Sequence, residues 1–271
     1  MTELKGVDDV LQERASVVPP LLYKYCAFNE WTASIFQKNE LYFRSPNDFN
    51  DPFDSIVRFT CEGSKQQKER FIREHIRLFY PHLSATEALS REETFTSGRM
   101  DNELMQSIEA EFMERRRRIG VYCMTKEKKH VLMWSHYANW HTGFCLEFKT
   151  DDLFFQSVQP VSYPPYSEVP CINLLIPDWN EVISRGAAGL LTKAKEWEYE
   201  HEWRIIDLVN GAKPRQFPPR ALHAVILGCR TQDKDRQQMF EWCKGRSPRP
   251  VLYQASKKKM EYGLDIEPIS Y

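Results

Sequence analysis

Carboxylates and aromatic side chains alternate in the segment 196–206, which reads Glu-Trp-Glu-Tyr-Glu-His-Glu-Trp-Arg-Ile-Ile. Read with a period of two, one face carries Trp197, Tyr199, His201, Trp203 and Ile205, and the other carries Glu198, Glu200, Glu202 and Arg204. This alternation predicts a strand with one buried face. Neighbouring carboxylates raise one another's pKa and an arginine lowers it, so the charged face is a candidate for acid–base chemistry. The alternative is a solvated edge strand whose charges prevent pairing with another sheet.

A second cluster of reactive side chains occupies the segment 134–141. It contains Trp134, Ser135, His136, Tyr137, Trp140 and His141. The two histidines are five residues apart, not the four that place a metal pair on one helix face, so no metal site is expected. Ser135 and His136 are adjacent, and adjacent helical residues do not face each other, which argues against a nucleophile–base pair. The alternative to a direct role at a site is that these histidines are core residues, or residues that support a site through their neighbours.

Two further segments have an unusual composition, one in proline, asparagine and aspartate and the other in arginine. The segment 45–54 combines proline with asparagine and aspartate, which predicts consecutive turns. That loop is either purely structural or orders one wall of a cleft, and it lacks the spacing of an EF-hand. The basic run 115–118 is either a solvated helix C-terminus or a phosphate contact.

Composition limits the class of protein. The 271 residues are 42% hydrophobic with a net charge of −1, which excludes a strongly basic protein that binds nucleic acid through phosphate contacts alone. Seven widely spaced cysteines without a CxxC pair indicate neither a disulfide framework nor a structural zinc site. The sequence contains no long apolar run and no signal peptide, so we expect no membrane contact and a cytoplasmic location.

The elements that must position these residues are short strands and a few helices. Strands are expected at 21–26, 41–44, 120–125, 144–148, 161–163, 221–228, 251–255 and 262–269, and helices at 30–39, 131–140, 179–194 and 232–244. Residues 1–18 form an expected leader, and 19–271 a single domain with a helical insertion at 64–118. Without a βαβ series, a GxGxxG pattern or a P-loop, the fold class is α+β.

Four ordered motifs between residues 20 and 230 resemble a bacterial family, the domain of unknown function 2971. They are Leu22-Tyr23-Lys24-Tyr25, Leu41–Asp54, Met133–Ala138 with His141-Thr142-Gly143, and Trp197–Arg204. The family name carries no activity.

More distantly, the order of the motifs resembles the ADP-ribosyltransferases, whose split mixed sheet clamps NAD as a substrate. Glu200-His201-Glu202 is similar to the Glu-x-Glu of the arginine-type enzymes. The resemblance implies that Glu202 is the catalytic carboxylate, which holds the ribose 2′-hydroxyl and stabilises an oxocarbenium-like transition state, and that Glu200 orients or deprotonates the acceptor. The residues implied to bind NAD are Lys24, Tyr25, Arg44, Thr125, Trp134, Ser135, His136 and Tyr137.

The function implied by this resemblance is an NAD-dependent ADP-ribosyltransferase acting on a nucleic-acid or protein acceptor. A toxin or phage-defence effector is the expected setting, with an antitoxin or regulatory protein as a further partner. Two other classes stay open. One is a metal- or carboxylate-dependent hydrolase, either a nuclease or a glycosidase, and the other is a non-catalytic binding module.

Overall fold

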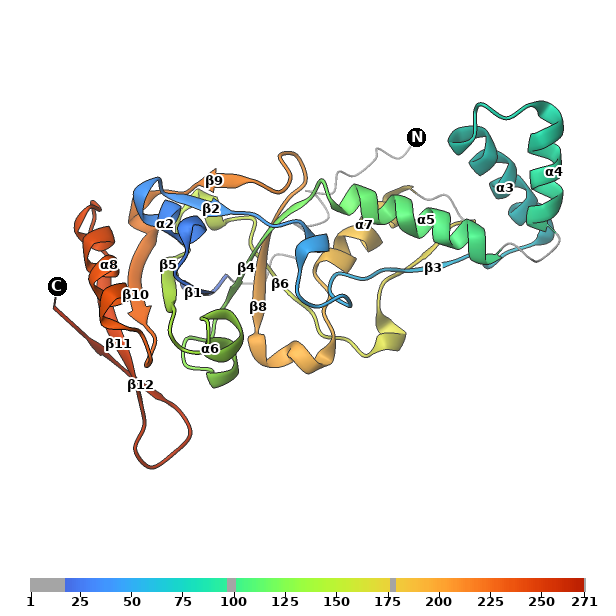
Figure 1. Cartoon of the computed structure of the whole chain (residues 1–271). Helices are drawn as coiled ribbons and strands as arrows, with labels where there is room; N and C mark the ends of the chain where they lie inside the picture. Colours follow the sequence, from blue (N-terminus) through green and yellow to red (C-terminus); the bar gives the residue numbers. More distant parts are fainter. Residues whose placement is uncertain (1–17, 97–100, 176–178, 271) are drawn as a thin grey trace.

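The computed structural model describes residues 18–96, 101–175 and 179–270 (Figure 1). Nearly all of the expected leader 1–18 lies outside the described residues. Within the described residues, eight strands form one mixed sheet, which confirms the α+β class with a mixed sheet. Its order is β12 (Leu264–Pro268), β11 (Val251–Lys257), β10 (Leu222–Leu227), β5 (Phe144–Lys149), β1 (Leu21–Cys26), β4 (Gly120–Thr125), β8 (Glu202–Asp207) and β6 (Gln159–Pro160). The β10–β11 pair is parallel, and the other pairs are antiparallel.

The centre of this sheet is weakly paired. β1 pairs with β5 along its whole length, and β4 pairs with β8 along its whole length. Between β1 and β4, however, the register holds at one position, Tyr23 opposite Thr125. The sheet is therefore two well-paired halves that join at Tyr23 of β1 and Thr125 at the end of β4, and the two strands share no other paired position.

The described residues also form two smaller, two-stranded sheets. β2 (Glu40–Tyr42) pairs with β9 (Pro214–Gln216), and β3 (Arg58–Thr60) pairs with β7 (Cys171–Asn173). The expected strand 41–44 ends at Tyr42, because Arg44 turns its backbone to Val121. The strand expected at 161–163 is wrong: β6 ends at Pro160, and the backbone of Ser162 instead bonds to Leu191 and Lys193.

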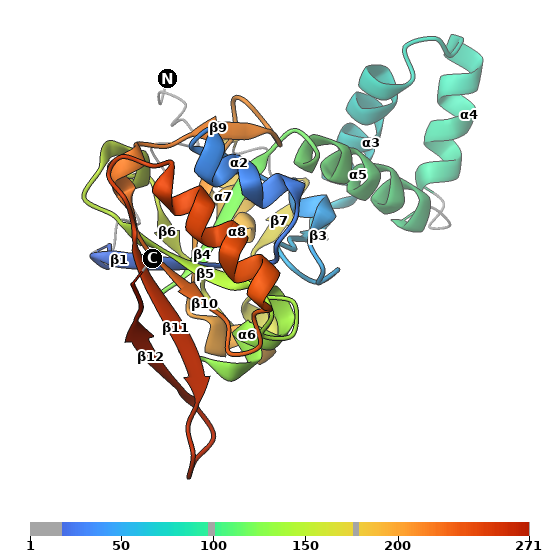
Figure 2. The same cartoon turned by 60° about the vertical axis from the view of Figure 1, so that its left-hand side comes forward.

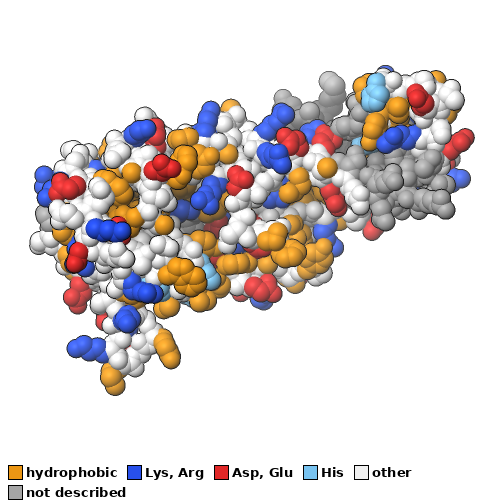
Figure 3. Space-filling view, in the orientation of Figure 1, with side chains coloured by type: hydrophobic (Ala, Val, Ile, Leu, Met, Phe, Trp, Pro, Cys, Tyr) orange, Lys and Arg blue, Asp and Glu red, His pale blue; other side chains and the backbone are white. Residues whose placement is uncertain are grey.

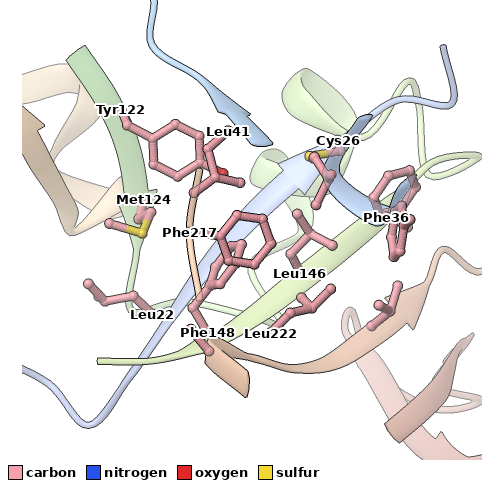
Figure 4. Packing of buried hydrophobic residues seen from close by; sticks show 14 of the residues in the cluster. Leu22, Cys26, Phe36, Leu41, Tyr122, Met124, Leu146, Phe148, Phe217 and Leu222 are labelled. Atoms are coloured by element: carbon pink, nitrogen blue, oxygen red, sulfur yellow. The ribbon is translucent and has the colours of Figure 1, made fainter. Parts of the chain in front are cut away.

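Helices cover both faces of the main sheet. α2 (Glu30–Gln37) and α8 (Asp233–Lys244) lie together on one face (Figure 2) and bury Phe36 and Met239 in the larger core. Figure 4 shows side chains of this core that come from β1, β4, β5 and β10. α6 (Val131–Tyr137) packs Met133 and Trp134 into a second core on the opposite face.

Local backbone chemistry sets where these helices begin and end. Asn29 begins α2 with a capping box, in which its side chain accepts from the Thr32 amide. The helix expected at 131–140 ends earlier, because Asn139, Trp140 and His141 have φ values of 45°, 56° and 67°, outside the helical region. α7 (Trp179–Leu190) likewise ends before the expected Ala194.

The charged strand expected at 196–206 starts six residues late. Lys195–Glu200 forms a 3₁₀ helix, His201 is left-handed with φ of 43°, and β8 begins at Glu202. The reason is the length of the partner strand: β4 ends at Thr125, which lies opposite Glu202, so the preceding residues have no strand to pair with. The edge-strand alternative is also wrong, because β8 lies between β4 and β6 and buries both Glu202 and Arg204.

The described part of the segment 64–118, which omits residues 97–100, contains three helices: α3 (Lys65–Phe79), α4 (Ala85–Thr96) and α5 (Asp101–Arg116). α3 and α4 extend away from the sheets, and α5 leads back towards β4 (Figures 1 and 2). Ile72 and Ile76 form a small core of their own there. In the basic run, Arg115 pairs with Glu111, whereas Arg116 is buried and donates to the Asp54 carbonyl.

Candidate functional site

A cavity of about 550 Å³ opens where β1 and β4 separate. Residues 23–26 of β1, followed by Ala27, and residues 121–125 of β4 line its two sides, and α2, α6 and the loop after β2 close it. Its volume is in the range of about 300–1,000 Å³ that small-molecule sites occupy. Phe49, Asn50 and Asp54 line it, so the Asn/Asp-rich loop forms one wall of a cleft, one of its two expected roles.

One part of the cavity wall is basic and aromatic. Lys24 lies on β1, with its Nζ 5.1 Å from the ring centre of Tyr122, and Arg44 follows β2. Among residues 18–96, 101–175 and 179–270, neither cation has an acidic ion-pair partner. Trp31 and Tyr42 line the same region with their rings 5.8 Å apart. An anionic ligand with a flat ring matches this composition.

Another part of the wall is a buried carboxylate. Glu200, the last residue of the 3₁₀ helix, is 2% exposed. Its Oε1 accepts a hydrogen bond of 2.7 Å from the Tyr137 hydroxyl on α6, and its Oε2 lies 2.5 Å from Lys193 Nζ. The Thr125 hydroxyl donates to its backbone carbonyl, which attaches the end of the 3₁₀ helix to the end of β4.

Glu202 lines the cavity too, but its oxygens are occupied. Arg204 donates to both of them at 2.8 and 2.9 Å, and Lys193 Nζ lies 3.1 Å from Oε2. Arg204 is fully buried and also donates to Asp54, Ser55 and the Leu190 carbonyl. Lys193 in turn lies 3.7 Å from Asp54. The acids and bases therefore form one network that joins the loop, β8 and the chain after α7.

The two glutamates have opposite protonation tendencies. Burial raises the pKa of Glu200, and the opposing attraction of Lys193 does not cancel it. Burial would also raise the pKa of Glu202, but Arg204 and Lys193 outweigh it and hold that pKa well below its usual range. Burial and Glu200 raise the pKa of Tyr137, so its hydroxyl stays protonated and donates. Glu200 is thus the carboxylate suited to exchange a proton, and Glu202 is a fixed anion.

Most of the residues expected at the site do meet at this cavity. They are Lys24, Tyr25, Arg44, Thr125, His136, Tyr137, Glu200 and Glu202. Tyr25 contributes its ring more than its hydroxyl, which donates to the Glu127 carbonyl. The charged side chain that patterns did not reveal is Lys193, which follows an apolar helix end and has no distinctive neighbour in sequence.

Trp134 and Ser135 are not among the residues that line the cavity. Trp134 is fully buried, packs edge-on to Tyr25 and donates from Nε1 to the Lys128 carbonyl, so it supports β1 from the second core. Ser135 faces His141 instead of its neighbour His136, with Oγ and Nε2 3.0 Å apart. The helix turn points both side chains away from the opening between β1 and β4.

The fold and the cavity define an α+β protein with a mixed sheet and a buried charge network in the wall of its central opening. Residues 133–205 match the sequence model of a family described as "Protein of unknown function (DUF2971)", which confirms the resemblance over that range. The matched range includes Tyr137, Lys193, Glu200 and Glu202. No curated protein and no solved structure matches the chain.

The described ranges contain no group of three or more His, Cys, Asp and Glu side chains arranged to hold a metal ion. Their helices are all too short or too polar to cross a membrane.

Proposed function

We propose that this protein is a cytoplasmic NAD-dependent ADP-ribosyltransferase. The observation that supports this proposal most directly is that one cavity combines two cations, Lys24 and Arg44, with a buried carboxylate, Glu200. NAD carries a pyrophosphate, which suits the two cations, and a ribose that becomes positively charged as nicotinamide leaves, which suits the carboxylate. The separation of β1 from β4 also agrees with the split sheet of that enzyme class.

In the proposed reaction, the bond between ribose C1′ and the nicotinamide nitrogen breaks, and its electron pair leaves with nicotinamide. The acceptor atom forms a new bond to C1′ and loses a proton, which Glu200 takes and passes to water. The raised pKa of Glu200 makes it the stronger base of the pair. Glu202 contributes fixed negative charge and orients Lys193. Glu200 therefore replaces Glu202 as our candidate for the reacting carboxylate.

The two-carboxylate glycosidase agrees less well with the geometry. Such enzymes place the scissile bond between their carboxyl groups. Here Lys193 Nζ contacts both Glu200 and Glu202 and occupies that space. A substrate could place its scissile bond there only by displacing the Lys193 ammonium, which lies near three carboxylates.

The test is incubation of the purified protein with NAD labelled on the adenylate phosphate and a cell extract. Glu200→Gln keeps the size of the side chain but removes its basicity, and we expect it to lower label transfer and nicotinamide release at least 100-fold. Glu198→Gln, an exposed change in the same 3₁₀ helix, is the matched control. Separation of the products into protein, RNA and DNA names the acceptor class.

The outcomes separate the remaining classes. Nicotinamide release without label transfer indicates an NAD hydrolase. Label transfer that survives Glu200→Gln contradicts the assignment of the reacting carboxylate. The absence of any NAD turnover, with every variant folded, contradicts the proposal and leaves a binding module or a different hydrolase.

The proposed setting is a toxin or phage-defence effector controlled by an antitoxin or regulatory protein. Expression of the wild-type protein in a bacterial host should then slow growth, and Glu200→Gln should relieve the effect at equal protein level. Equal growth of the two strains would contradict this setting.

A further inference from the structure

The aromatic pair Trp31 and Tyr42 is exposed at the rim of the cavity. Trp31 lies in the first turn of α2 and is 65% exposed, and Tyr42 ends β2 and is 43% exposed. Their ring centres are 5.8 Å apart and the ring planes are inclined at 49°, so the rings touch without stacking face to face. Large flat surfaces thus remain open to solvent beside a cavity, where burial by a ligand would be favourable.

Cations lie next to these rings in the same cavity. Arg44 is two residues beyond Tyr42. Its backbone is hydrogen-bonded to that of Val121, which holds the base of the Arg44 side chain at the cavity wall. Lys24 extends from β1 over Tyr122. The acids of the charge network are committed to Lys193 and Arg204, and no ion pair joins them to Lys24 or Arg44 in the described part of the chain.

We infer that Trp31, Tyr42, Lys24 and Arg44 form a subsite for a nucleoside diphosphate, in which the base stacks on the Trp31–Tyr42 pair and the two phosphates meet the cations. A flat base matches the open ring faces, and a diphosphate carries two groups for two cations. This subsite rests on the proposed function in one respect: it would hold the adenosine diphosphate half of NAD. Its chemistry does not require turnover, however, and ADP alone should bind.

The arrangement makes separate predictions for the two halves of the ligand. Adenosine probes the rings, pyrophosphate probes the cations, and ADP probes both. Trp31→Ala should weaken ADP and adenosine about tenfold, which corresponds to the loss of one base–aromatic stack, and leave pyrophosphate unchanged. Lys24→Met with Arg44→Met should weaken ADP and pyrophosphate about tenfold or more and leave adenosine unchanged.

The experiment is calorimetric titration of each probe into the full-length protein and its variants. Trp140→Ala is the matched control, because Trp140 is 68% exposed and does not line the cavity. Trp31→Phe should restore most of the ADP affinity, which a purely steric or folding defect would not do. Thermal midpoints close to wild type would show that the variants are folded, as the exposure of Trp31 leads us to expect.

The result that supports the inference is the crossed pattern, with the ring variant and the cation variant each losing its own half of the ligand. ADP affinity equal in wild type and Trp31→Ala overturns it, and so does the absence of ADP binding. The proposed function fails by a different result, the absence of NAD turnover. ADP binding with the crossed pattern but without turnover would keep the subsite and remove the transferase.

Discussion

The ammonium of Lys193 lies 2.5 Å from Oε2 of Glu200, and both side chains are almost completely buried. Burial of an ion pair is costly unless each charge is fully compensated. Glu202 and Asp54 complete the shell of Lys193, and Tyr137 completes that of Glu200. The pair therefore connects the stability of the fold to the protonation of the proposed reacting group.

Removal of the lysine should destabilise the protein strongly. In Lys193→Met, the carboxylates of Glu200 and Glu202 lose their shared cation inside the protein, and we expect about 3–5 kcal/mol less free energy of unfolding. Urea denaturation at pH 7 measures this difference. Lys193→Arg, which keeps the charge, is the comparison and should lose less. A change below about 1 kcal/mol in Lys193→Met would show that water reaches the network.

The two glutamates should give stability differences of opposite slope with pH. The raised pKa of Glu200 means that its folded-state benefit is present below the ordinary value of 4.5 and is lost as the pH rises through the folded pKa. The lowered pKa of Glu202 means that its benefit is present above 4.5 and is lost as the pH falls towards the folded pKa.

These signs are tested with Glu200→Gln and Glu202→Gln in parallel. From pH 4 upwards, the free energy of unfolding of wild type minus that of Glu200→Gln should fall, whereas the same difference for Glu202→Gln should rise. Equal slopes for the two variants would show that the carboxylates titrate as one group.

The Tyr137 hydroxyl should control the pH dependence of the proposed reaction. Its hydrogen bond lowers the pKa of Glu200, so Tyr137→Phe should raise that pKa further and move the acidic limb of nicotinamide release to higher pH. Tyr199→Phe, a change on the neighbouring 3₁₀ helix, is the control. An unshifted limb would mean that a different group sets it.

Trp134 and Ser135 should affect stability rather than ligand binding. Trp134→Ala removes a fully buried indole, and we expect a loss of about 3–5 kcal/mol in the free energy of unfolding. Ser135→Ala, which breaks the contact with His141, should lose about 1 kcal/mol or less. ADP affinity of the folded protein should stay within about twofold of wild type in both. A tenfold loss for Ser135→Ala would return this residue to the site.

Periodicity predicted the elements well where the residues adjacent in sequence decide the conformation. β1 and β4 have the expected bounds, and Asn29 caps α2 as its side chain favours. The segment 196–206 was harder, because its alternation is real but only the part that has β4 beside it becomes a strand. Pairing in a sheet is a non-local property, and alternation alone does not show where the partner ends.

By itself, the sequence determined the α+β class, the family resemblance and most of the polar residues at the cavity, since these depend on composition, turn chemistry and ordered motifs. Tertiary structure alone decided that Asp54, Lys193 and Glu200 share one buried network, because these residues come from three separate segments. It also decided that the pKa of Glu200 is raised and that of Glu202 is lowered. The two carboxyl groups are identical and lie two residues apart, but their pKa values differ. Burial raises both pKa values, and only Glu202 has Arg204 beside it, which lowers its pKa and keeps it an anion.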